Sequence, residues 1–199
     1  DTLVRVKHVT GSNYNDILVG DSAGNKLIGG EGDDILSGAA GDDTLMGGAG
    51  DDELLGGSGS DTASYEDAES EVVVDLNRID AQDTEGDGID LISQIENLTG
   101  SQFDDTLIGD AGANVLSGGD GIDLLQGNDG DDILMGGAGD DQLQGGEGSD
   151  TASYADAEFD VTVDLNIVES QETGGGGDDT LTEIENLIGS QDNDLLIGN

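Results

Sequence analysis

The sequence contains no cysteine and no proline, and only four of its 199 residues are basic, against 47 acidic ones. Without cysteine, no disulfide can hold the fold together. The formal net charge of −43 makes the chain a polyanion that nucleic acid and anionic lipid repel, so neither is an expected partner. No apolar run approaches the ~20 residues that a membrane-spanning helix needs, so we expect no membrane span.

Aromatic residues are also rare, at 3% of the chain. Low hydrophobicity combined with a large net charge is typical of intrinsic disorder. Glycine is abundant, however, with 36 residues, and it recurs at a fixed spacing. A disordered acidic tail has no reason to place leucine at every ninth residue, so the regular spacing favours a fold.

The spacing is nine residues and is clearest in residues 29–64, which read GGEGDDILS, GAAGDDTLM, GGAGDDELL and GGSGSDTAS. Glycine occupies the first and fourth places, aspartate the sixth, and leucine or alanine the eighth. This pattern is the G-G-x-G-x-D-x-U-x nonapeptide, which is typical of a parallel β-helix that binds calcium. We therefore predict an all-β fold, a parallel β-roll (β-solenoid) of stacked calcium-binding nonapeptide repeats.

A longer repeat of 89 residues lies over the short one, because the glycine register starts at Gly11, Gly100 and Gly189. The predicted units are an N-terminal strand or cap at 1–10, a first block of six nonapeptides at 11–64, a connector at 65–99, a second block of six nonapeptides at 100–153, a second connector at 154–188 and the start of a third block at 189–199.

Each connector has 35 residues, one short of four nonapeptides. Val72, Val74 and Leu76 alternate with other residues in the first connector, which indicates a strand, and Val161, Val163 and Leu165 repeat the pattern in the second. We interpret the connectors as metal-free rungs that continue the coil. The alternative is a flexible, glycine-rich spacer.

A nine-residue unit has room for about six residues of turn and three of strand. Glycine at the first, second and fourth places permits positive φ, which so tight a turn requires. Successive side chains of a strand point to opposite faces, so the eighth-place leucine is expected to face the core. Two units then make one coil, and strands of successive coils stack in parallel ~4.8 Å apart.

Stacking brings sixth-place aspartates from units two apart close together. The predicted pairs are Asp34 with Asp52, Asp43 with Asp61, Asp123 with Asp141 and Asp132 with Asp150. Like charges so close oppose folding unless a cation lies between them. Calcium takes carboxylate and carbonyl oxygens in a flexible shell, whereas magnesium demands a strict octahedron and zinc prefers nitrogen and sulfur. We expect about eight to ten calcium ions and a chain that folds only when they bind.

The nonapeptides resemble those of the RTX (repeats-in-toxin) family, the haemolysin-type calcium-binding repeat proteins of Gram-negative bacteria. GGEGDDILS and GGAGDDELL match the family pattern at every fixed place, and thirteen units carry the resemblance. It implies a right-handed β-roll, export through a type I secretion apparatus, and folding outside the cell, where calcium is plentiful. The expected location is secreted or extracellular, at the bacterial cell surface.

In this family the sixth-place side chain binds calcium, and carbonyls of the first four places complete the shell. The side-chain ligands that the resemblance implies are Asp16, Asp34, Asp43, Asp52, Asp61, Asp105, Asp123, Asp132, Asp141, Asp150 and Asp194, with weaker sites at Asn25 and Asn114. The implied carbonyl ligands are those of Gly29, Gly30, Glu31, Gly32, Gly38, Ala39, Ala40, Gly41, Gly47, Gly48, Ala49, Gly50, Gly118, Gly119, Asp120, Gly121, Gly127, Asn128, Asp129, Gly130, Gly136, Gly137, Ala138 and Gly139. Tyr14, Phe103 and Asp192 replace the fourth-place glycine, so the first turn of each block is expected to be incomplete.

A second calcium motif is weaker. Residues 83–88 (DTEGDG) are similar to the start of an EF-hand loop, but the twelfth position is Gln94 instead of glutamate. The equivalent stretch of the second connector lacks most of these acids. We interpret the segment as a solvated loop, with an accessory ion site as the alternative.

Two functions are compatible with these patterns. The first is a structural or spacer segment, one that also assists export, in an adhesin or surface protein; the 89-residue repeat favours it because long-period arrays build reach. The second is the C-terminal RTX portion of a secreted enzyme or toxin, such as a polysaccharide-modifying enzyme, protease or haemolysin. Extracellular polysaccharide or a cell surface would be the partner. With one histidine and no cysteine, the chain itself is not expected to be an enzyme.

Overall fold

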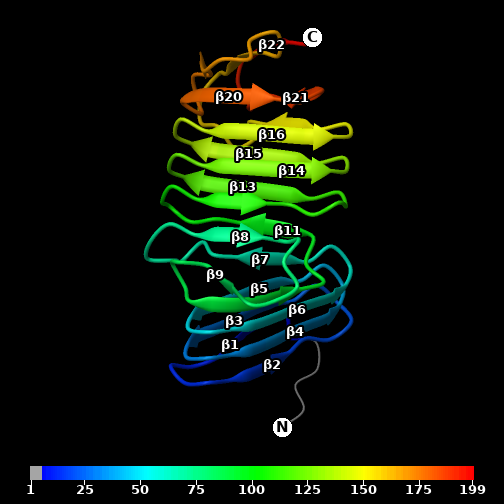
Figure 1. The fold of residues 1–199 in the computed structure, drawn as a ribbon, viewed down its shortest axis with the longest axis vertical. Helices are drawn as coiled ribbons and strands as arrows, with labels where there is room; N and C mark the ends of the chain where they lie inside the picture. The colour runs from blue at the N-terminus through cyan, green and yellow to red at the C-terminus, as the bar shows by residue number, and fades with distance from the viewer. Residues whose placement is uncertain (1–5) are drawn as a thin grey trace.

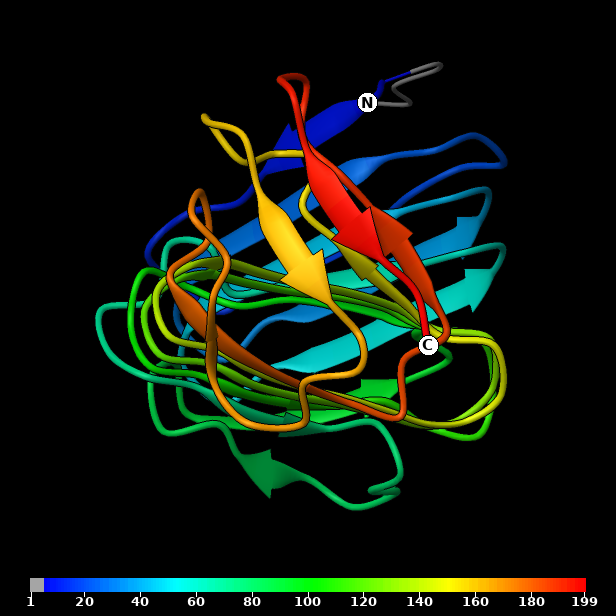
Figure 2. The ribbon, with the colours of Figure 1, turned by 90° about the horizontal axis from the view of Figure 1, so that it is seen from above.

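A computed structural model describes residues 6–199, which form a rod of stacked strands (Figure 1). The described part of the chain begins at one end of the rod and reaches the C-terminus at the other (Figure 1). Viewed along the rod, the coils of the second block superimpose as a flattened loop (Figure 2). Within residues 6–199 there is no helix with the length and apolarity to cross a membrane.

One face of the rod is a single sheet of nine strands in which all neighbours are parallel. In spatial order the strands are β1 (His8–Thr10), β3 (Lys26–Glu31), β5 (Thr44–Ala49), β7 (Thr62–Ser64), β11 (Asn97–Thr99), β13 (Val115–Asp120), β15 (Ile133–Ala138), β17 (Thr151–Ser153) and β21 (Asn186–Ile188). This parallel stacking confirms the predicted β-roll. β1 lies inside the segment 1–10 that was predicted as a strand or cap, and residues 1–5 of that segment fall outside the described residues.

The opposite face is divided into three sheets. The first holds β2 (Ile17–Val19), β4 (Ile35–Ala40), β6 (Glu53–Ser58), β10 (Ile89–Ser93) and the antiparallel β9 (Gln82–Asp83). The second holds β8 (Val73–Asp75), β12 (Thr106–Ile108), β14 (Leu124–Asp129), β16 (Gln142–Glu147), β20 (Asp178–Thr182) and the antiparallel β19 (Gln171–Glu172). The third pairs β18 (Thr162–Asp164) with β22 (Leu195–Ile197). Both breaks fall at the connectors.

Eighth-place side chains form the core of the rod. Within a block they pair two units apart, as Leu36 does with Leu54, so two nonapeptides make one coil as predicted. The buried eighth-place residues are Leu27, Leu36, Leu45, Leu54, Ala63, Leu107, Leu116, Leu125, Leu134, Leu143 and Ala152. Leu196 differs: it lies at the end of the rod and keeps 38% of its surface exposed, because no further coil covers it.

The division of each unit into turn and strand differs from the prediction. In the middle of each block the strands have six residues, as in Ile35–Ala40, and there only the fourth to sixth places form the turn. The first and last strands of a block, such as Ile17–Val19, have three. Parallel pairing resumes after the first-place glycine, where Ala39 and Ala40 pair with Gly57 and Ser58. Backbone hydrogen bonding between coils therefore extends the strand into what the sequence pattern assigned to the turn.

The role predicted for the glycines holds at two of the three places. Second-place Gly30 and fourth-place Gly32 have φ of 121° and 111°, a region that favours glycine. First-place Gly29 is not among the residues with positive φ, so the expectation was wrong there. Glycine is required at this place because it has no side chain. A Cβ on Gly29 would collide with the carboxylate of Asp34 and the carbonyl oxygen of Gly47.

The first connector carries strands of the roll, but not in simple chain order. On the continuous face, β7 and β11 are neighbours, with Ala63 paired to Leu98. On the divided face, β8 pairs with the later β12, whereas β10 returns to pair with the earlier β6. Between β7 and β11 the chain thus adds three strands (β8, β9 and β10) to the divided face and none to the other, where a regular coil would add strands to both.

Candidate functional site

Sixth-place aspartates form a ladder of hydrogen bonds along each edge of the rod. The backbone N–H of Asp34 donates to Oδ1 of Asp52 over 2.7 Å, and that of Asp43 donates to Oδ1 of Asp61 over 2.9 Å. The second block repeats these contacts from Asp123 to Asp141, from Asp132 to Asp150, from Asp105 to Asp123 and from Asn114 to Asp132. One oxygen of each receiving carboxylate is thereby fixed to the neighbouring coil.

The other oxygen, Oδ2, is buried without any hydrogen-bond partner in eight of these residues. They are Asp34, Asp43, Asp52, Asp61, Asp123, Asp132, Asp141 and Asp150. Each of these residues has at most 3% of its surface exposed. A buried carboxylate oxygen without a partner is costly, so the same deficit at eight equivalent places indicates that a cation belongs there.

First-place glycine shapes the space around each of these oxygens. The Oδ2 of Asp34 and the carbonyl oxygen of Gly47, which belongs to the next coil, both lie where a Cβ on Gly29 would be. In the second block, Gly118 makes the same space between Asp123 and the carbonyl of Gly136. Carboxylate and carbonyl oxygens from successive coils therefore converge, and calcium takes this mixture of ligands.

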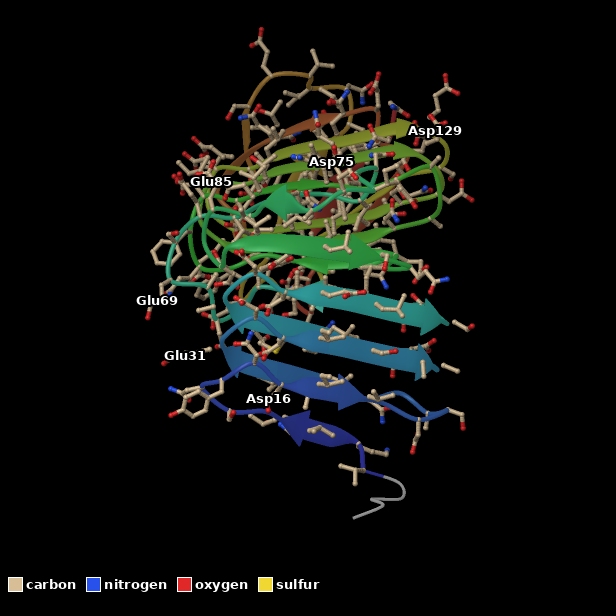
Figure 3. All side chains as sticks on the ribbon, turned by 60° about the horizontal axis from the view of Figure 1, so that its bottom comes forward. Asp16, Glu31, Glu69, Asp75, Glu85 and Asp129 are labelled. Atoms are coloured by element: carbon tan, nitrogen blue, oxygen red, sulfur yellow. The ribbon has the colours of Figure 1, made fainter. Side chains whose placement is uncertain are left out.

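The predicted carbonyl ligands do not all have the same surroundings. Those of the first place, such as Gly47, face the partnerless carboxylate oxygens. Those of the third place accept backbone hydrogen bonds, as Ala49 does from the N–H of Gly32 over 2.8 Å. The third-place side chains of Glu31 and Asp129 are exposed, and Figure 3 shows Glu31 at one edge of the rod and Asp129 at the other.

In residues 6–199, no three His, Cys, Asp or Glu side chains gather into a metal-binding group. A cation in these turns must therefore take several ligands from the backbone. Such a shell of hard oxygen ligands suits calcium and lacks the nitrogen and sulfur that zinc prefers.

The electrostatics of the turns also favour binding of a cation from the solvent. Burial, reinforced by neighbouring carboxylates, raises the pKa of Asp52, Asp123 and Asp141 to about 7, although a backbone amide that donates to each one opposes the shift. Between residues 6 and 199 the chain has one ion pair, Lys26 with Glu66 at 2.7 Å. Basic side chains in this part of the chain therefore do not neutralise the turns.

The other five predicted side-chain ligands already have partners at the block starts. Asp16, Asp105 and Asp194 accept a hydrogen bond from the hydroxyl of the serine four residues earlier, which is Ser12, Ser101 or Ser190. Asn25 and Asn114 accept a backbone N–H through Oδ1 and donate to a backbone carbonyl through Nδ2. A cation is therefore not needed to satisfy these oxygens.

Acids that continue each ladder into the connectors were missed by the nine-residue pattern. The N–H of Asp52 donates to Oδ1 of Asp90 over 3.0 Å, and that of Asp61 donates to Oε2 of Glu96 over 2.9 Å. Asp179 and Glu185 do the same in the second connector. The 89-residue period could have found them, since it relates Asp90 to Asp179 and Glu96 to Glu185.

The EF-hand-like segment forms a tight turn between β9 and β10. The N–H of Thr84 donates to the carbonyl of Gly88 over 2.8 Å, and strands flank the turn on both sides. The flanking helices of an EF-hand are thus replaced by a β-hairpin.

Comparison with protein families matches the RTX calcium-binding nonapeptide repeat in four copies, at residues 10–45, 28–63, 93–125 and 117–152. Together the copies cover more than half of the chain and include all eight aspartates that have a partnerless oxygen. Comparison with curated protein sequences gave no match.

Proposed function

We propose, from the premise that this chain belongs to the RTX calcium-binding nonapeptide repeat family, that it is a module of a secreted bacterial protein which folds when calcium binds outside the cell. The observation that carries this proposal is the set of eight buried carboxylate oxygens without a partner. These charges are costly to bury unless a cation pairs with them.

An estimate of magnitude supports a calcium-dependent fold. A site with a dissociation constant of ~10⁻⁴ M, as in many extracellular modules, adds about 1.5 kcal/mol of stability at millimolar calcium. One ion at each of the eight partnerless oxygens would add on the order of 12 kcal/mol, comparable to the net stability of a whole domain. At sub-micromolar calcium the contribution vanishes, so the chain would remain unfolded inside a cell.

Within the host protein we propose a structural or spacer role, in an adhesin or another surface protein. β7, β11, β13 and β17 lie in one continuous sheet, so each 89-residue unit lengthens the same rod. A chain that is unfolded at cytoplasmic calcium levels also suits export through a type I secretion apparatus. In a secreted enzyme or toxin the same module would assist export and folding.

A calcium titration tests the proposal. Circular dichroism should show a disordered chain in a calcium chelator and strand signal at millimolar calcium, and native mass spectrometry should count about eight ions. Magnesium at the same concentration is the control and should not produce the strand signal. A full strand signal in the chelator, or two or fewer bound calcium ions, would refute the proposal.

A further inference from the structure

The aspartates that end the ladders differ from those inside the blocks in one contact. Asp90 accepts the N–H of Asp52 through Oδ1, as a sixth-place aspartate does. Its Oδ2, however, accepts a hydrogen bond from the hydroxyl of Tyr65 over 3.0 Å. Both side chains are buried, with 1% and 2% of their surface exposed. A protein hydroxyl therefore occupies the position where the block aspartates lack a partner.

The second connector provides an independent copy of this arrangement. Tyr154 donates its hydroxyl to Oδ2 of Asp179 over 2.9 Å, and the Thr173 hydroxyl lies 2.9 Å from the same oxygen. Asp179 accepts the N–H of Asp141 through Oδ1, so it ends the ladder of the second block as Asp90 ends that of the first.

On the edge that carries Asp90 and Asp179, the lower end of each ladder is closed by a serine. The Ser101 hydroxyl lies 3.0 Å from Oδ2 of Asp105, and the Ser12 hydroxyl lies 2.7 Å from Oδ2 of Asp16. Each ladder on this edge thus runs from a serine-capped aspartate, through two aspartates with partnerless oxygens, to a tyrosine-capped one.

We propose that these hydroxyls act as caps that replace calcium at both ends of the ladder on this edge, so that Asp90 and Asp179 anchor the fold without binding an ion. The inference rests on the proposed function, because it assumes that calcium occupies the partnerless oxygens. Tyr65 and Tyr154 are then positioning residues, since each donates a hydrogen bond where a block aspartate would meet a cation.

The caps also couple the connectors to calcium binding. Asp52 belongs to the calcium-binding ladder, and its N–H bonds directly to Asp90, which bonds to Tyr65. When calcium binding orders Asp52, the backbone N–H of Asp52 is held in position to donate to Asp90. The connector folds with its block but adds no ion site on this edge.

A pair of matched variants tests the caps. Asp52→Asn and Asp90→Asn each keep the Oδ1 that accepts a neighbouring N–H, and each removes one buried charge. Native mass spectrometry at saturating calcium should show at least one ion fewer for Asp52→Asn and the wild-type number for Asp90→Asn.

The outcomes separate the two proposals. Loss of an ion from Asp90→Asn, as large as that from Asp52→Asn, would overturn the caps while leaving the calcium-binding function intact. If the wild type binds no calcium, the proposed function itself fails.

A rescue experiment tests the tyrosine separately. Tyr65→Phe should lower the folding equilibrium constant at fixed calcium by about tenfold or more, because a buried carboxylate loses its donor. Urea unfolding measures this constant. Adding Asp90→Asn to Tyr65→Phe should recover part of the loss, since a buried amide without a partner costs less than a buried carboxylate without one. A loss that persists unchanged in the double variant would show that the hydroxyl does not neutralise Asp90, which would overturn the cap.

Discussion

The blocks and the connectors continue the same ladder and satisfy it in different ways. In a block, Asp52 has a buried oxygen that no protein group reaches. In the connector, Asp90 has the same kind of oxygen bonded to Tyr65. Both carboxylates accept an N–H from the coil below them. The difference lies only in what meets the second oxygen.

This comparison explains why glycine and tyrosine occupy their places. First-place Gly29 has no Cβ, so the Asp34 carboxylate and the Gly47 carbonyl can both lie close against it, as ligands for one ion. The buried ring of Tyr65 instead brings a donor to Asp90. A turn whose aspartate lacks a partner depends on calcium from the solvent for its stability. At Asp90 a side chain of the protein itself supplies the partner. Stability of the whole rod is therefore set by calcium in the blocks and by side-chain contacts in the connectors.

Filling one open turn should have the largest effect of a single substitution. Gly29→Ala places a methyl group against Asp34 Oδ2 and the Gly47 carbonyl, so it should remove one ion and strain the backbone. We expect a loss of about 3 kcal/mol at millimolar calcium, roughly half from the ion and half from the strain, measured by urea unfolding. Gly112→Ala is the control, because the nearest atom to its Cβ is 3.2 Å away. Equal losses in both variants would contradict an ion site at Gly29.

Acid should distinguish metal-free from calcium-loaded protein. Burial raises the pKa of Asp52 to about 7 and that of Asp132 to about 6 in the metal-free fold. A carboxyl with a raised folded pKa binds protons more tightly when folded, so its contribution favours the fold at low pH and is lost as pH rises through the folded value. In a chelator, strand signal should therefore be greater at pH 5 than at pH 8.

With calcium present, the pH dependence of folding should reverse. Protons compete with the ion for the same carboxylates, so lowering the pH from 7 to 4 should release calcium, which an ion-selective electrode records. Strand signal in a chelator that is unchanged or weaker at pH 5 than at pH 8 would count against buried carboxylates as the obstacle to metal-free folding.

The smallest effect should come from the ion pair that joins a block to a connector. Lys26 on β3 contacts Glu66, but their side chains are 37% and 48% exposed, so solvent screens the attraction. A double-mutant cycle with Lys26→Gln and Glu66→Gln should give a coupling energy of about 0.5 kcal/mol. A value of several kcal/mol would mean that this pair, and not the Asp90 contact, holds the two regions together.

Much of the fold follows directly from the nine-residue period. Strand pairing inside a block always joins residues two units apart, as Leu36 pairs with Leu54. A pattern of fixed period therefore predicts the stacking, the leucine core and the alignment of Asp34 with Asp52. The eight partnerless aspartates all belong to the set that the sixth place identified.

Contacts at the connectors have no common spacing. Ala63 pairs with Leu98, whereas Val74 pairs with Leu107. No single period links such pairs, so the divided second face could not be predicted from periodicity. The cap on Asp90 was missed for the same reason, since Tyr65 lies 25 positions earlier in the chain.

By itself the sequence determined a coil of two units, a core of eighth-place leucines and carboxylates aligned along the edges, because each depends on one constant separation. Only the tertiary structure decided which carboxylates lack a partner. Whether a carboxylate has a partner depends on which hydroxyl groups of the connectors and block starts lie beside it in the folded chain. The separation of residues along the sequence does not determine these contacts.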